Sequence, residues 1–180
     1  MSMVKLIGPC ALLACASATA IAAEGPGLGL ATTPADIAAW NISIQPDGTG
    51  LPAGSGTAAT GKAIYVEKCA ACHGQEGAGQ PFDRLAGGQG SLASPQPVKT
   101  VGSFWPYATT VFDYIRRAMP FQAPQSLTND EAYAVTAYLL AVNGIVKDNA
   151  VMNAQTLRNV KMPNRDGFIL AYPERVPASP

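Results

Sequence analysis

Histidine and charge are what this sequence has least of. Its 180 residues include a single histidine, His73, and only 13% are charged, with 12 basic and 12 acidic side chains. A formal net charge of zero argues against the basic face that nucleic acid or an anionic lipid surface would require. Strand-like alternation and repeats of roughly 20–50 residues are also missing from the pattern. The lone histidine excludes any metal site that needs two imidazoles from one chain.

The first 23 residues have the pattern of an export signal. Lys5 gives a positive start, and the residues after it are apolar or small up to Ala23. A glycine and a proline inside this run argue against a membrane span. An alternative is a lipid anchor on Cys15, although the apolar run continues past that cysteine. We expect simple cleavage and a periplasmic protein of near-neutral charge, since removing Lys5 leaves 11 basic and 12 acidic residues.

Three helices are predicted between two irregular extensions. Apolar periodicity predicts helices over 57–71 and 109–118, and a capping box at 128–131 opens a third that runs to Asn143. The flanking segments are rich in glycine, proline and small residues, apart from a helical turn over 36–40. The sequence therefore predicts an all-α fold with four parts: a signal peptide (1–23), an N-terminal extension (24–56), a helical domain (57–146) and a C-terminal extension (147–180).

The segment Cys69-Ala70-Ala71-Cys72-His73 has the C-x-x-C-H pattern of covalent haem c attachment. Residues three and four apart share a helical face, so both thiols can reach the two vinyl groups of one porphyrin. The imidazole that follows then faces the iron. Export supports this reading, because it removes Cys10 and Cys15 and leaves one thiol pair in an oxidising compartment, where it would oxidise unless used.

Two other uses of a C-x-x-C pair fit less well. A structural zinc site needs about four protein ligands, and the mature chain has no further cysteine and no second histidine. A thioredoxin-like motif expects a βαβ context, which the helical pattern does not provide. The sequence therefore predicts one haem c per chain, with His73 as one axial ligand.

The sixth iron ligand must be a methionine, a weaker donor or nothing, because there is no second histidine. Met119 is favoured, since it follows one helix, precedes Pro120 and leads towards the cap of the last helix. Met162, which also precedes a proline, and Met152 stay as alternatives. A histidine–methionine pair raises the reduction potential and leaves no vacant position, which suits electron transfer better than oxygen chemistry.

Polar partners of the haem are also expected. The second ring nitrogen of His73 needs an acceptor to fix the ring, and the carbonyl of Pro81 is the candidate. Arg116 and Arg117 are adjacent and cannot share a helix face, so one of them is expected to pair with a haem propionate while the other is solvated.

Aromatic residues are expected around the haem and at a helix crossing. Trp105 and Tyr107 are candidates for the propionate side, with ordinary core packing as the alternative. Gly61 and Tyr65 on the first helix, with Tyr138 on the last, are expected to form a close and purely structural crossing.

These motifs resemble those of class I cytochromes c, which share the C-A-A-C-H, A-M-P and S-L-T-x-D-E patterns and the Gly/Tyr–Tyr contact. More narrowly, the chain is similar from about Pro34 to Phe168 to the cytochrome subunits of bacterial sulfite dehydrogenases and of the sulfane dehydrogenase of the thiosulfate-oxidising Sox system. The segments that carry this likeness are 47–52, 98–108, 112–120 and 161–168.

The resemblance implies a class I cytochrome c fold with one covalent haem, and Cys69, Cys72, His73 and Met119 carry over by position. It also implies a molybdenum-cofactor subunit that oxidises a sulfur compound and passes electrons singly to this haem, with a downstream cytochrome or oxidase. Some sulfane dehydrogenase cytochromes have a second haem domain, for which this chain has neither room nor motif. That departure favours the sulfite dehydrogenases.

We therefore expect an electron-transfer protein that is not itself an enzyme. The alternatives are a free-standing periplasmic shuttle that feeds a terminal oxidase and a haem enzyme with an open iron site. The extensions favour a docked subunit, because a shuttle needs neither. They hold apolar anchors, which either bind the partner or wrap the protein's own haem crevice: Trp40, Ile42, Ile44, Met162, Phe168, Ile169 and Tyr172.

Overall fold

A computed structural model describes residues 25, 28–169 and 171–172 of the chain. The signal peptide and the Cys15 anchor, both predictions, lie outside these residues. The described elements, in chain order, are α1 (Pro34–Trp40), β1 (Ser55–Thr57), α2 (Ala58–Lys68), α3 (Ala70–His73), the 3₁₀ turn η1 (Gln75–Gly77), α4 (Ala108–Ala118), α5 (Asn129–Val142), β2 (Val151–Asn153) and α6 (Ala154–Leu157). The three predicted helices are α2, α4 and α5, and the mostly helical fold class is confirmed.

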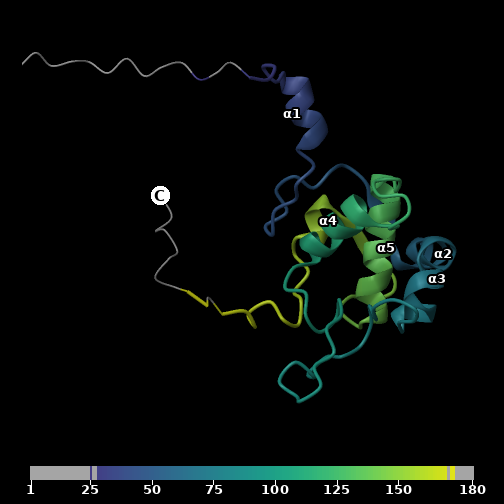
Figure 1. Ribbon diagram of the computed structural model, residues 1–180. Helices are drawn as coiled ribbons and strands as arrows, with labels where there is room; N and C mark the ends of the chain where they lie inside the picture. Colours follow the sequence, from purple (N-terminus) through teal and green to yellow (C-terminus); the bar gives the residue numbers. More distant parts are fainter. Residues whose placement is uncertain (1–24, 26–27, 170, 173–180) are drawn as a thin grey trace, which may run out of the picture.

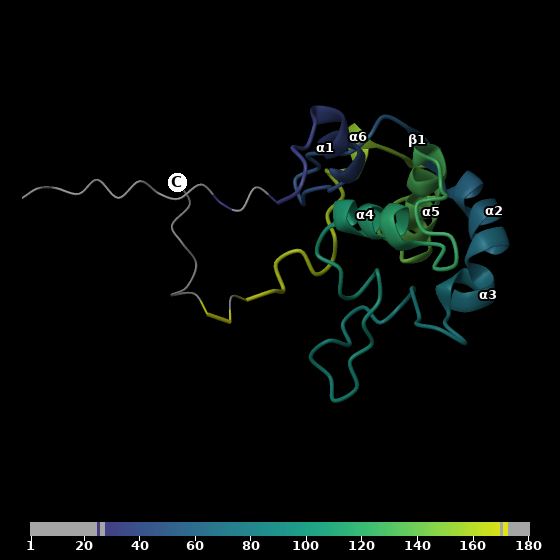
Figure 2. The same cartoon turned by 45° about the horizontal axis from the view of Figure 1, so that its top comes forward.

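Helix α5 is the centre of the body, with α2 on one side and α4 on the other (Figures 1 and 2). The predicted capping box opens it, since the Thr128 hydroxyl accepts from the Glu131 N–H and the Glu131 carboxylate accepts from the Thr128 N–H. Every residue of α5 from Ala132 to Leu140 is buried. A helix that is apolar on all sides is one that other elements cover on all sides.

Helices α2 and α5 cross in close contact at Gly61. A Cβ atom at this position would collide with the carbonyl of Ala134, so only glycine lets the two backbones approach this closely. Beside the glycine, the rings of Tyr65 and Tyr138 lie 5.1 Å apart, centroid to centroid. The predicted Gly61–Tyr65–Tyr138 crossing is therefore present.

A small antiparallel sheet joins the two extensions, although the sequence shows no strand pattern. Strand β1 pairs with β2 in the register Ser55↔Asn153, Gly56↔Met152 and Thr57↔Val151. Each strand has three residues, which is too short for a period-two pattern to stand out. The sheet packs on α5, where Gly56 leaves space for the backbone of Ala134.

The inner parts of both extensions are core of the domain. Ile44 from the N-terminal side and Met152, Leu157 and Met162 from the C-terminal side are all less than 7% exposed and belong to the main hydrophobic cluster. The alternative in which the extensions pack on their own domain therefore describes these inner parts.

The outer parts of the extensions differ. Helix α1 has no buried residue, and Figure 1 shows it standing away from the helical body. Trp40, at its end, is 86% exposed and Ile42 is half-buried, so of the expected anchors on this side Ile44 packs on the body and Trp40 does not. The C-terminal segment ends in exposed side chains, with Phe168 53% and Ile169 91% exposed.

Candidate functional site

The C-x-x-C-H motif lies where α2 gives way to α3, not within one continuous helix. Cys69 leaves helical geometry at φ −127°, ψ −36°, which corrects the predicted helix over 57–71. The N–H groups of Cys72 and His73 both bond to the Cys69 carbonyl, at 3.1 and 3.0 Å. Gly74 ends the turn with a positive φ of 73°. This single turn brings the two thiols and the imidazole to one wall of a cavity.

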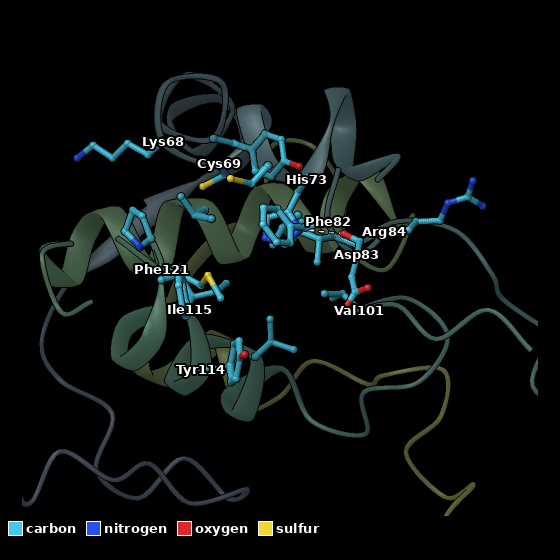
Figure 3. A pocket seen from close by; sticks show the side chains of 18 of the residues that line it. Lys68, Cys69, His73, Phe82, Asp83, Arg84, Val101, Tyr114, Ile115 and Phe121 are labelled. Carbon is cyan, nitrogen blue, oxygen red and sulfur yellow. Dashed lines mark hydrogen bonds between the residues drawn. The ribbon is translucent and has the colours of Figure 1, made fainter. Parts of the chain in front are cut away.

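The cavity has a volume of about 430 Å³ and is lined mainly by apolar side chains. Figure 3 shows Cys69 and His73 on one side of it and Ile115 and Tyr114, from α4, on the other. Aromatic and aliphatic groups from the loops and from α5 complete the lining, among them Phe82, Leu85, Val101, Trp105, Phe121, Leu127, Val135 and Leu139. A site of this size, with a few polar groups at fixed places, suits a flat apolar cofactor.

The imidazole of His73 is oriented by a loop carbonyl. Its Nδ1 lies 2.8 Å from the carbonyl oxygen of Asp83, and Figure 3 draws this contact as a dashed line. A carbonyl can only accept, so Nδ1 carries the proton and Nε2 keeps its lone pair for a metal.

The prediction that the Pro81 carbonyl accepts this hydrogen bond is wrong, because the acceptor lies two residues further along the chain. The Phe82 N–H donates to the Cys72 carbonyl at 2.9 Å, and the Phe82 carbonyl accepts from Gln80 at 2.9 Å. The Phe82 carbonyl is thus already occupied, and the carbonyl of Asp83, the next along, faces the ring.

The three methionines within the described residues have different surroundings. Met119 lines the cavity, at the residue that caps α4, where its N–H bonds to the Ile115 carbonyl at 3.0 Å. Met152 and Met162 are 4% and 2% exposed, belong to the hydrophobic core and are not among the cavity-lining residues. Of the three, Met119 alone has its side chain at the wall of the cavity.

Positive charge at the cavity comes from residues that the sequence analysis missed. Lys68, Arg84 and Lys99 line it, and Figure 3 shows the Arg84 guanidinium at the rim, pointing outward. Lys68 pairs with Glu131 at 2.6 Å. That contact raises the pKa of Lys68. The same contact, together with the hydrogen bonds of the cap on Thr128, lowers the pKa of Glu131. Lys99 could have been found, because it lies in segment 98–108, which carries the family resemblance. Nothing in the sequence around Arg84 indicates a place at the cavity.

Neither Arg116 nor Arg117 lies in the cavity lining, so the expected propionate partner on this pair is wrong. Arg116 donates to the Asn129 side chain at 3.1 Å. Arg117 pairs with Asp113 at 2.9 Å, one helical turn away, and also donates to the Ile42 carbonyl. Arg116 therefore connects α4 to the start of α5, and Arg117 connects it to the N-terminal extension.

The two aromatic candidates separate in the structure. Trp105 lines the cavity and makes an edge contact with the Tyr114 ring at 5.7 Å between centroids. Tyr107 is not among the lining residues; the Arg165 guanidinium lies over its ring, 4.2 Å from the centroid. Trp105 is therefore at the cavity wall, and its place on the propionate side stays a prediction. Tyr107 is not at this wall and instead ties the C-terminal extension to the start of α4.

Two ionisable groups at this wall are partly shielded from solvent. Burial raises the pKa of the Cys69 thiol to about 11 and that of the Tyr65 hydroxyl to about 12. Both groups are therefore uncharged at neutral pH, which suits a wall that faces an apolar ring.

Comparison with known proteins identifies the family of this chain. The family model for cytochrome c matches residues 58–143, which hold the motif, the cavity helices and Met119. The chain belongs to the cytochrome c family. Its c-type haem is covalently attached, with Cys69 and Cys72 at the C-x-x-C-H position.

Two relatives extend the comparison beyond the family. The cytochrome is similar to a chain in the crystal structure of the sulfane dehydrogenase SoxCD from Paracoccus pantotrophus, with a TM-score of 0.78 and 46% identity. That likeness covers 83% of this chain and 74% of the other. A thiosulfate dehydrogenase from Stutzerimonas stutzeri (strain A1501) is 36% identical over 91 residues, 49% of this chain. The cytochrome spans only 28% of the length of that protein.

Among the helices that the structure describes, none is both long and apolar enough to cross a membrane. The described part of the cytochrome is an electron-transfer domain with two irregular extensions, whose inner parts pack against it.

Proposed function

We propose that this cytochrome is the electron-accepting subunit of a periplasmic dehydrogenase that oxidises a sulfur compound at a molybdenum cofactor in a separate subunit. The observation that carries this is the extent of the likeness to the SoxCD chain. The cytochrome c match covers 58–143, whereas the SoxCD likeness covers 83% of the chain and so includes parts of the extensions. The sulfite or sulfane substrate belongs to the partner, and this chain is not catalytic.

We propose His73 Nε2 and the Met119 sulfur as the axial ligands, with thioether bonds from Cys69 and Cys72. Bound haem supplies a site that gains and loses one electron at a time. The protein's part is to hold the donors in place: Asp83 fixes the imidazole ring, and the cap of α4 fixes Met119. With His73 and Met119 both bound, the iron would have no place for a substrate, which suits electron transfer between proteins.

Export places the cytochrome with its partner. The signal pattern in residues 1–23 supports cleavage near Glu24 and a periplasmic location. Mass spectrometry of the native protein should give a mature N-terminus near Glu24. A diacylglyceryl group on Cys15 would instead place the cytochrome on a membrane surface.

The outer parts of the extensions are the proposed docking surface for the molybdenum subunit. Helix α1 is only seven residues long, and helices this short are marginal without packing, yet it carries a full capping box between Thr33 and Asp36 and buries nothing. Trp40 is 86% exposed at its end. Exposed aromatic side chains on preformed elements are the residues that tend to dominate protein interfaces.

Trp40→Ala tests this docking surface, with Val66→Ala as the matched control. Val66 is also exposed, at 54%, but lies on α2 outside the extensions. Because both side chains are exposed, both variants should keep the haem spectrum and the stability of the wild type. We expect Trp40→Ala to lose at least tenfold in affinity for the co-purifying molybdenum subunit, a typical hot-spot loss, and Val66→Ala to lose little.

Deleting 147–180 would be a poor test of docking, because it removes β2 and the core residues Leu157 and Met162.

In the intact complex, sulfite or a sulfane-sulfur substrate should reduce this haem, and the more effective of the two identifies the enzyme. Native cytochrome that purifies alone and is reduced by neither substrate in the presence of periplasmic extract would support a free shuttle instead.

A further inference from the structure

Asn143, the residue that caps the end of α5, is a buried polar side chain with no role in the proposed electron transfer so far. It is 8% exposed. Its Oδ1 accepts from the Gly87 N–H at 2.9 Å, and its Nδ2 donates to the carbonyls of Leu85 at 3.2 Å and Leu139 at 2.8 Å. The Asn143 backbone carbonyl also accepts from the side chain of Gln89 at 2.9 Å. One residue of α5 therefore holds a loop 54–58 positions earlier in the sequence.

The same loop is held from its other side by Thr100. This side chain is 3% exposed, and its hydroxyl donates to the Gly87 carbonyl. The Leu85 carbonyl accepts from Val101 at 3.2 Å, and the Leu85 N–H donates to Gly77 at 2.8 Å. Both peptide groups of the loop, at Leu85 and Gly87, are therefore fixed in position. The carbonyl that orients His73 belongs to Asp83, two residues before Leu85.

We propose that Asn143 is a positioning residue for His73, acting through residues 85–87 on the Asp83 carbonyl. The proposal rests on the proposed role of His73 as an axial ligand. A hydrogen bond from Nδ1 to a carbonyl makes the imidazole a stronger donor, and a stronger donor favours ferric over ferrous iron. Because Asn143 holds the acceptor in place, the reduction potential of the haem is lower with this side chain than without it.

The competing explanation is that Asn143 serves only as the end of a helix. As the C-cap of α5, it would then stabilise the fold and leave the iron unaffected. The two explanations differ in what the removal of the side chain changes. A cap changes stability alone, whereas a positioning residue changes stability, potential and the protection of the His73 Nδ1 proton.

The test is Asn143→Ala in the full-length holoprotein, with Thr136→Val as the matched control. Thr136 is a fully buried polar residue of the same helix, and its hydroxyl bonds at 2.7 Å to the Ala132 carbonyl within α5. The reduction potential is measured by redox titration, and the exchange of the Nδ1 proton by NMR. We expect Asn143→Ala to raise the potential and to speed exchange about tenfold, the effect of losing support worth one hydrogen bond. Thr136→Val should lose stability but change neither quantity.

Thr100→Val supplies a second route, because it removes the other hold on Gly87 without touching α5. It should move the potential and the exchange rate in the same direction, and it decides the matter if Asn143→Ala does not fold. Unchanged potential and exchange in these variants, with stability lost as in Thr136→Val, would overturn the proposal and leave Asn143 as a cap. If the wild type shows no Nδ1 proton from an iron-bound histidine, the assignment of His73 itself fails, which is a distinct result.

Discussion

Two Met-Pro pairs in this cytochrome end up in opposite surroundings. Met119-Pro120 leaves the end of α4, and Met119 lines the cavity beside the C-x-x-C-H wall. Met162-Pro163 lies in the C-terminal extension, where Met162 is 2% exposed within the packed core. The same dipeptide thus fills space in one region and offers a sulfur atom to a cavity in the other. The two differ in how completely other side chains surround the thioether. That depends on tertiary packing and not on the dipeptide itself.

The largest effect expected from breaking this comparison is on stability, at Met162. Met162→Ala should lower the free energy of unfolding by about 2–5 kcal/mol, because a buried side chain leaves a cavity in a close-packed core. The haem spectrum of the folded fraction should stay unchanged. Denaturant unfolding followed by far-UV circular dichroism gives the stability. Loss of axial ligation in this variant would mean that Met162, and not Met119, is the iron ligand.

A smaller effect is expected from the Lys68–Glu131 ion pair at the cavity wall. Glu131→Gln removes the charge but keeps the capping geometry, and should cost up to about 1 kcal/mol at neutral pH. The folded-state pKa of Glu131 is lowered from its ordinary value of 4.5, chiefly by the hydrogen bond with Lys68. Its contribution is therefore present above about pH 4.5 and is lost as the pH falls through the lower folded pKa.

The stabilities of the wild type and of Glu131→Gln should therefore converge as the pH falls through the lowered folded pKa of Glu131. Curves that stay a constant distance apart down to acid pH would show that the carboxylate charge contributes nothing to this wall. Glu131→Ala, which also removes the cap, is the control, and should be less stable than Glu131→Gln by about 1 kcal/mol.

The smallest effect is a shift in potential from Lys99, a cation of the cavity lining. Lys99→Gln should lower the reduction potential slightly, since a nearby positive charge disfavours ferric iron. The change should be on the order of 0.5 kcal/mol or less, because the side chain is exposed and screened by solvent. Lys161→Gln, beside Met162 in the other region, should leave the potential unchanged. Equal shifts in the two variants would show that the potential senses net charge and not the cavity lining.

Local patterns allowed much of the fold to be predicted. The capping box at Thr128 and Glu131, the small residue Gly61 and the C-x-x-C-H segment depend on neighbours a few positions away, so the sequence alone indicates them. The directions of Arg116, Arg117 and Tyr107 depend on contacts with other segments: Asn129 at the start of α5, Ile42 in the N-terminal extension and Arg165 in the C-terminal extension. The acceptor for His73 is set by which backbone carbonyls of one tight turn are already hydrogen-bonded. No side chain in the sequence indicates which of them stays available.

The central claim is that His73 and Met119 ligate one haem iron, and the near-infrared band of the ferric protein tests it most directly. The wild type should show the weak band of methionine–iron ligation, Met119→Ala should lose it, and Met162→Ala should keep it. Loss of the band in Met162→Ala, with the band retained in Met119→Ala, would contradict the account.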